Sequence, residues 1–191
     1  GSEDWLEGYR QKLSETLGQR TFALRWSGSA MVSTNEAQSL AKTIVTTLER
    51  NPLTPSEPLS LIGHSYGGVM MWKIAKELAK SECGKKIDYL VMMGTPVESV
   101  PTQYPSNIKQ AYYLWSPADH FSQEGARLNG YSVIPIGGAI TAPGDPTRPK
   151  IYGNFATKEF SNVPHTKWHV PPYENNLGGW EVLKWLGTTL R

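Results

Sequence analysis

Cysteine, long apolar runs and an excess of charge of one sign are all scarce in this chain. The single cysteine, Cys83, excludes an internal disulfide, and no histidine stands beside it in sequence to activate a thiolate. The longest apolar stretches, at residues 59–63 and 89–94, are far shorter than the roughly 20 residues that cross a bilayer. The 19 Lys and Arg residues nearly balance the 17 Asp and Glu residues and form no basic cluster. Nucleic-acid binding therefore has no electrostatic support, and the sequence predicts a soluble protein.

The composition is that of an ordinary globular domain. With 191 residues, 39% of them hydrophobic and 19% charged, we expect a single domain over residues 1–191. One cysteine fits the cytosol, and export remains an alternative. Gly and Pro (18 and 14 residues) form about 17% of the chain, above the roughly 12% of average proteins. They are dense at 121–153, where we predict an irregular loop or lid.

The first fifty residues indicate a helix, a strand and a second helix. Apolar residues recur every three to four positions over 3–17 and a glycine follows, which predicts a helix with a glycine C-cap. Residues 21–26 are rich in aromatic and β-branched side chains, which predicts a strand. Ser33 and Glu36 have the spacing of a capping box, and the apolar stripe after them predicts a helix that ends before an Asn-Pro pair.

Strands and helices alternate in the middle of the chain. The apolar run at 59–62 predicts a strand, and a helical pattern over 69–78 follows after a tight turn. The runs at 89–93 and 111–115 are typical of strands buried on both faces of a parallel sheet. A last helical pattern lies at 180–186. The alternation predicts the α/β class, with a mostly parallel sheet flanked by helices.

The pentapeptide GHSYG at 63–67 matches G-x-S-x-G, a pattern short enough to arise by chance. Its position between a predicted strand and a helix is more specific, because a nucleophile elbow has to lie there. Ser65 would hold a strained backbone, and the flanking glycines, Gly68 included, would keep side chains out of the strand–helix packing. The backbone N–H of Tyr66, at the helix N-terminus, is the natural first donor to a developing oxyanion. The alternative is that Ser65 is an ordinary helix N-cap.

Residues 61–68, LIGHSYGG, resemble the elbow of the α/β-hydrolase superfamily in its lipase and esterase branch. Three downstream segments are similar to that family in order and spacing. They are a strand with a Gly-Thr-Pro turn at 92–97, a strand with the acid loop at 113–119, and the late histidine loop at 162–166. The resemblance covers residues 21–190 and implies the fold of that superfamily.

The resemblance implies a catalytic triad of Ser65, Asp119 and His165, in the chain order of this fold. His165 would take the proton of Ser65, and Asp119 would hold the imidazole in the correct tautomer. The competing interpretation of Asp119 is a solvated loop acid, and His169 competes with His165 as the base. The pair His165 and His169 has the spacing of two zinc ligands, but Thr166 stands where the metalloprotease pattern requires Glu. We expect no metal and no cofactor.

Four further residues are candidates for contacts with substrate: His64, Trp115, His120 and Trp168. His64 lies inside the elbow and, in the resembled fold, would point the wrong way for a base, while His120 adjoins the acid and would rim the pocket. For Trp115 the competing interpretation is packing in the core. Aromatic side chains around a cleft would suit an acyl chain or another apolar substrate.

One feature of the resembled fold is missing from the sequence. That fold has a strand with an oxyanion-loop glycine between the two strands expected here at 21–26 and 59–62. We therefore expect reduced or missing N-terminal strands. The second oxyanion donor would have to come from Gly1-Ser2 or from the loop Ser27-Gly28-Ser29.

The resemblance implies a serine hydrolase that cleaves carboxylic esters, of lipids or other acyl groups, through an acyl-enzyme on Ser65. Its partner would be a small-molecule or lipid ester, with transient contact to a membrane surface and no nucleic acid. The alternative is a non-catalytic protein or fragment of the same fold that binds an apolar ligand or a partner protein.

Overall fold

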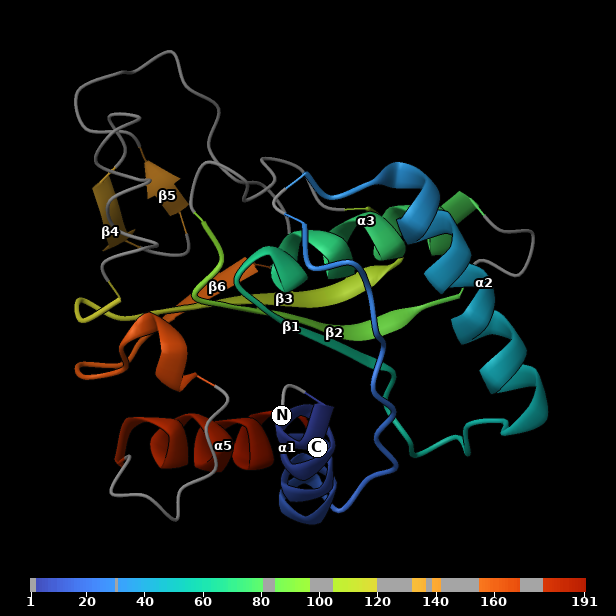
Figure 1. Cartoon of the computed structure of the whole chain (residues 1–191), viewed down its shortest axis with the longest axis horizontal. Helices are drawn as coiled ribbons and strands as arrows, with labels where there is room; N and C mark the ends of the chain where they lie inside the picture. The colour runs from blue at the N-terminus through green and yellow to red at the C-terminus, as the bar shows by residue number, and fades with distance from the viewer. Residues whose placement is uncertain are drawn as a thin grey trace.

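The computed structural model places a four-stranded parallel sheet at the centre of the molecule, with strand order β1-β2-β3-β6 (Figure 1). The strands are β1 (Ser60–His64), β2 (Ile87–Met93), β3 (Ile108–Trp115) and β6 (Phe155–Glu159). The structure describes residues 3–29, 31–80, 85–96, 105–119, 132–136, 139–141, 155–168 and 177–191.

Alternate side chains of the strands point to opposite faces of the sheet, and both faces are buried. On β2, Leu90 and Met92 belong to one apolar core, and Val91 and Met93 belong to the other. Period-2 alternation in a strand that is apolar throughout produces two cores rather than one wet face. The near-continuous apolar run in the sequence is explained by this double burial.

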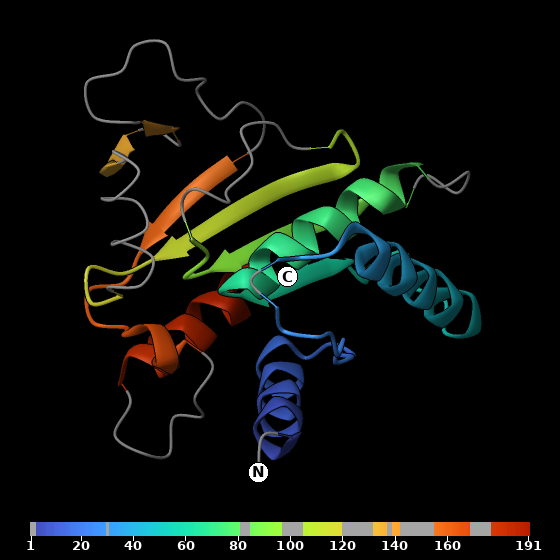
Figure 2. The same ribbon diagram turned by 45° about the horizontal axis from the view of Figure 1, so that its top comes forward.

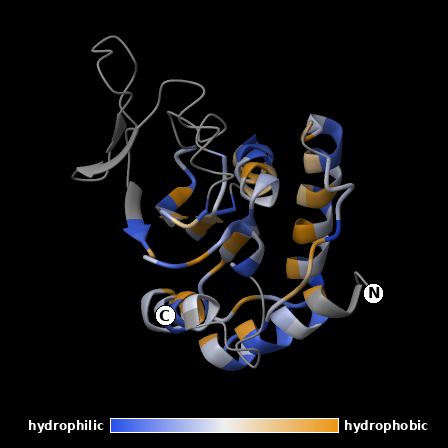
Figure 3. Cartoon of the chain, turned by 60° about the vertical axis from the view of Figure 1, so that its left-hand side comes forward, coloured by the Kyte–Doolittle hydropathy of each residue, from blue (hydrophilic) through white to orange (hydrophobic). Residues whose placement is uncertain are grey.

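Helices cover each face of the sheet (Figures 1 and 2). Helices α2 (Thr34–Arg50) and α3 (Tyr66–Lys80) pack on one face, and α1 (Glu3–Leu17) and α5 (Leu177–Thr189) pack on the other. Hydrophobic residues follow stripes along these helices, with hydrophilic residues between them (Figure 3). The parallel sheet and its flanking helices confirm the predicted α/β class with a mostly parallel sheet.

The N-terminus of α2 is capped differently from the expected capping box. Ser33 Oγ accepts a hydrogen bond from the Glu36 backbone N–H at 3.4 Å. The Glu36 carboxylate binds the backbone N–H and the hydroxyl of Ser27, at 2.6 and 2.9 Å. Half of the box is present, and its acidic residue secures the loop before the helix.

Several elements of the structure differ from those expected from the sequence. Residues 21–26 do not form a strand, while β6, which the sequence did not predict, pairs parallel with β3. Two short strands, β4 (Ser132–Ile136) and β5 (Ala139–Thr141), pair antiparallel inside the region expected to be irregular. Most of 121–153 lies outside the described residues, as does Cys83. A loop or lid over 121–153 stays a prediction.

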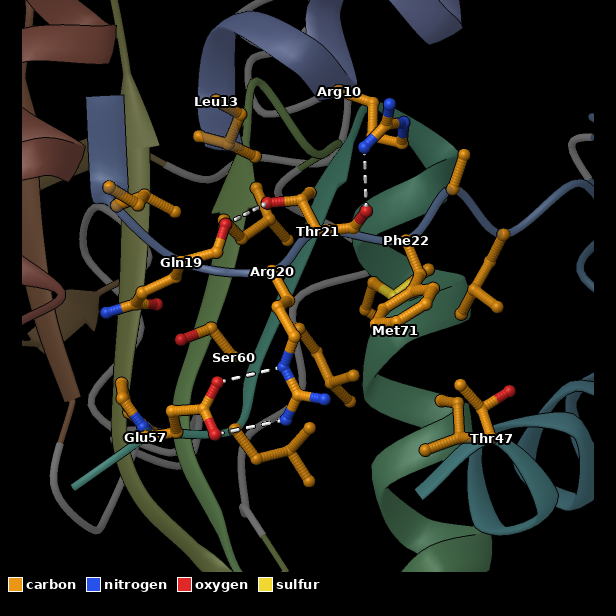
Figure 4. A pocket seen from close by; sticks show the side chains of 18 of the residues that line it. Arg10, Leu13, Gln19, Arg20, Thr21, Phe22, Thr47, Glu57, Ser60 and Met71 are labelled. Carbon is orange, nitrogen blue, oxygen red and sulfur yellow. Dashed lines mark hydrogen bonds and ion pairs between the residues drawn. The ribbon is translucent and has the colours of Figure 1, made fainter. Parts of the chain in front are cut away.

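An apolar groove of about 260 Å³ lies between β1 and the extended segment 19–24 (Figure 4). Arg10 Nη1 donates to the carbonyl of Thr21 at 3.1 Å, and Arg20 pairs with Glu57 at 2.9 Å, which fixes the segment on the far side of the groove. No ladder joins this segment to β1 in the described part of the chain. A strand requires a hydrogen-bonded neighbour, so residues 21–26 stay extended without becoming one.

Among the described residues, no helix is both long and apolar enough to cross a membrane.

Candidate active site

Ser65 lies in the one-residue turn between β1 and α3. Its φ is +54°, and it is the only non-glycine residue with positive φ in the described ranges. The Ser65 N–H donates to the carbonyl of Met93 at 2.9 Å, and its own carbonyl accepts from the Gly68 N–H at 2.9 Å. The chain reverses from strand to helix so sharply that the serine must adopt a left-handed conformation, which projects its hydroxyl beyond the sheet.

Two of the three glycines around Ser65 are required by close packing. A Cβ on Gly63 would overlap the carbonyl of Gly67, and a Cβ on Gly68 would overlap the Thr95 hydroxyl. A Cβ on Gly67 would meet nothing within 4 Å. The expectation that Gly67 clears space for strand–helix packing is therefore wrong, whereas Gly63 and Gly68 do so.

A hydrogen-bonded row joins Ser65, His165 and Asp119, three residues far apart in the sequence. His165 Nε2 lies 3.0 Å from Ser65 Oγ, and His165 Nδ1 lies 3.0 and 3.1 Å from the two oxygens of Asp119. Asp119 follows β3, and His165 begins the 3₁₀ turn η2 (His165–Lys167) that comes after β6. The carboxyl ends of parallel strands lie at the same edge of the sheet, so all three side chains meet there.

Exposure to solvent decreases from His165 to Asp119. The His165 side chain is 22% exposed, while Asp119 is wholly buried. A hydroxyl beside an imidazole that is itself held by a carboxylate is the arrangement that can activate serine as a nucleophile.

A buried serine connects the two loops that carry Asp119 and His165. Ser116 is buried, and its hydroxyl accepts hydrogen bonds from the backbone N–H groups of Ala118 at 3.2 Å and Val163 at 3.0 Å. One side chain therefore ties the acid loop to the histidine loop. The sequence carries no signal for this tie, because a serine after a strand is common in loops of any kind.

Gly94, at the end of β2, packs directly beneath the acid. Its φ is +53°, and a Cβ there would lie 2.5 Å from Asp119 Oδ2 and 2.6 Å from the indole nitrogen of Trp168. Glycine is therefore required both by conformation and by space. Gly94, the first residue of the Gly-Thr-Pro turn, thus packs against the site.

The four residues expected to contact substrate have different positions. The His64 ring lies 4.7 Å from the His165 ring, centroid to centroid, so it neighbours the row. Trp115 belongs to the apolar core under α3, which is the packing interpretation that the sequence left open. Trp168 is wholly buried and donates from Nε1 to Asp119 at 2.8 Å, so the expected contact with substrate is wrong. His120 lies outside the described residues.

The remaining expected groups around the site are the oxyanion donors, the alternative base and possible metal ligands. Tyr66 is the first residue of α3, the part of a helix whose N–H groups can donate outside it. The Ser27 N–H, expected as one source of a second oxyanion donor, is bound to Glu36 instead. Gly1, Ser2 and His169 lie outside the described residues. The described residues contain no cluster of three or more His, Cys, Asp or Glu side chains that could hold a metal ion.

The chain is similar to known proteins in sequence pattern and in fold. The model of the thioesterase domain family matches residues 7–125, more than half of the chain, a range that includes Ser65 and Asp119. No curated protein matches. A solved esterase from Pyrobaculum calidifontis aligns over 96% of this chain and 69% of its own, with a TM-score of 0.54 and 11% identity, a likeness of fold. With its parallel sheet and flanking helices, the chain belongs to the thioesterase domain family of the α/β-hydrolase superfamily.

Proposed function

We propose that this protein hydrolyses acyl thioesters or esters through an acyl-enzyme on Ser65. The observation that carries the proposal is the row in which His165 Nε2 lies 3.0 Å from Ser65 Oγ and Nδ1 lies 3.0 Å from Asp119. Membership of the thioesterase family supports the same reaction class.

The proposed reaction has two halves that use the same proton carrier. Ser65 Oγ forms a bond to the acyl carbon while its proton moves to His165 Nε2, and the bond to the leaving sulfur or oxygen then breaks as that atom takes the proton. Water repeats the sequence: it gives a proton to His165 and adds to the acyl carbon. The carboxylic acid leaves as Ser65 regains its hydrogen. Asp119 keeps Nδ1 protonated, so that Nε2 can accept.

The developing oxyanion would be stabilised from the N-terminus of α3. The Tyr66 backbone N–H is the proposed first donor, and the helix dipole adds to it because its positive end faces the turn.

The leaving group is the finer part of the proposal. The family match favours a thioester, and the resemblance in the sequence favours an oxygen ester. An acyl-enzyme mechanism accepts both, since Ser65 attacks the same acyl carbon. A matched pair of substrates with one acyl chain, as its N-acetylcysteamine thioester and as its p-nitrophenyl ester, separates the two by kcat/KM.

A fluorophosphonate probe tests the proposal directly. We expect the parent to be labelled and to turn over at least one of the matched substrates, and Ser65→Ala to lose labelling and at least about a thousandfold in kcat. Ser39→Ala, at an exposed position of α2, is the matched control and should behave like the parent. Equal labelling of Ser65→Ala and parent would overturn the proposal.

The second candidate is binding of an apolar ligand without turnover. The apolar groove beside β1 favours it, because apolar side chains line most of its wall and Ser65 is not among the lining residues. In the same assay, saturable binding of a fatty acid with no serine labelling and no turnover would favour this candidate. Turnover that depends on Ser65 would favour the first.

A further inference from the structure

Trp168 lies behind the proposed catalytic row, in a position that substrate does not reach. The side chain is wholly buried in the core formed with α1 and α5, and its ring meets Phe160 edge to face at 6.0 Å between centroids. Trp168 follows the 3₁₀ turn that His165 begins. The base and the indole are therefore carried by the same short turn.

The indole N–H is directed at the carboxylate of Asp119. It donates to Oδ2 at 2.8 Å, while His165 Nδ1 lies 3.0 Å from Oδ1 and 3.1 Å from Oδ2. A wholly buried carboxylate needs donors to replace the water it has lost, and hydrogen bonds to a charged acceptor are stronger than neutral ones. The indole and the imidazole thus hold the carboxylate from two sides.

Packing leaves this contact little freedom. Gly94 lies so close to both partners that a Cβ would come within 2.5 Å of Asp119 Oδ2 and 2.6 Å of Trp168 Nε1. The ring cannot slide toward β2, and the core around Phe160 holds its other side.

We propose that Trp168 is a positioning residue for the reaction: its N–H fixes the Asp119 carboxylate toward His165 and withdraws part of its negative charge. The inference rests on the proposed function. Without that donor, the carboxylate would hold a protonated imidazole more strongly and would itself take up a proton more readily. Both effects inactivate the base at a higher pH than in the parent.

The test compares pH–rate profiles of the parent, Trp168→Phe and a protein with 3-benzothienylalanine at 168, in which sulfur replaces the N–H in a ring of nearly the same shape. We expect both changes to lower kcat about ten- to a hundredfold with KM unchanged. We also expect the acid limb of kcat/KM to move to higher pH. The benzothienyl ring preserves the packing, so its effect reports on the hydrogen bond even where Trp168→Phe folds poorly.

Trp180→Phe, at an exposed tryptophan of α5, is the matched control and should keep the parent profile. An unchanged acid limb with the benzothienyl ring, whether or not kcat falls, would overturn the positioning role and leave the proposed function standing. If the parent shows no turnover, or turnover that Ser65→Ala leaves unchanged, the proposed function and the positioning role are both overturned.

Discussion

At Ser65 the backbone is held in a conformation that a non-glycine residue adopts only at a cost of about 1–2 kcal/mol. Hydrogen bonds to the carbonyl of Met93 and from the N–H of Gly68 hold it there. The strain places the hydroxyl within 3.0 Å of His165 Nε2. This turn can form only because Gly63 and Gly68 lack a side chain, since a Cβ at either position would overlap neighbouring atoms.

The two glycines on either side of Ser65 should respond in opposite ways to alanine. In Gly63→Ala the new methyl group meets the backbone of Gly67 and Gly68, so we expect the free energy of unfolding to fall by about 1–3 kcal/mol and kcat/KM to fall with it. Gly67→Ala has open space within α3, and we expect a gain of about 0.5–1 kcal/mol. Urea denaturation and ester turnover check both, and equal destabilisation by the two changes would contradict the packing argument.

Among the elements, the loops after β3 and β6 decide whether the row forms. Ser116 accepts from the Val163 N–H across these loops, and Trp168 reaches from the second loop to the acid of the first. Asp119 and His165 each lie only a few residues beyond the end of a parallel strand, so small shifts of either loop would separate the two side chains.

Removal of the Ser116 hydroxyl should therefore affect both stability and rate. Ser116→Ala leaves the buried Val163 N–H without its acceptor, and we expect the free energy of unfolding to fall by about 1–3 kcal/mol. We expect kcat to fall about tenfold, since catalysis is sensitive to misplacement of its groups by about 1 Å. Ser161→Ala, at an exposed position of the loop after β6, is the control. If Ser116→Ala keeps the kcat of the parent in the ester assay, the loops hold their geometry without the hydrogen bond from Val163 to Ser116.

The sequence predicted the elements whose pattern is local. The strand before Ser65, the helix after it and the α2 helix have apolar periods that a single segment can show. The sequence missed β6, FATKE, because its polar residues become a strand only when β3 supplies the partner. Residues 21–26 have strand-like residues but no neighbour within a ladder. Ser65, Asp119 and His165 each follow a strand in a recognisable motif, whereas the Trp168 contact arises from packing between loops that no motif records.

For the whole molecule, the sheet separates two apolar cores, and α1 closes the core on the side of α5. Tyr9 of α1 is buried there, and its hydroxyl points to the sulfur of Met93 at 3.9 Å. Met93 is also the residue whose carbonyl holds Ser65. The docking of α1 is thereby linked to the strand end that carries the site.

Tyr9 gives the molecule a specific weakness at alkaline pH. Burial raises the pKa of the Tyr9 phenol above its usual value, so the folded state keeps its proton while the unfolded state releases it above about pH 10. The free energy of unfolding should then fall, by up to about 1.4 kcal/mol per pH unit from this group, as the pH rises beyond that value. Tyr9→Phe removes the ionisable group. We therefore expect the free energy of unfolding, measured by urea denaturation between pH 9 and 12, to decline less steeply, by up to about 1.4 kcal/mol per pH unit for the one proton removed. Parallel declines in parent and variant would mean that Tyr9 ionises without leaving the core.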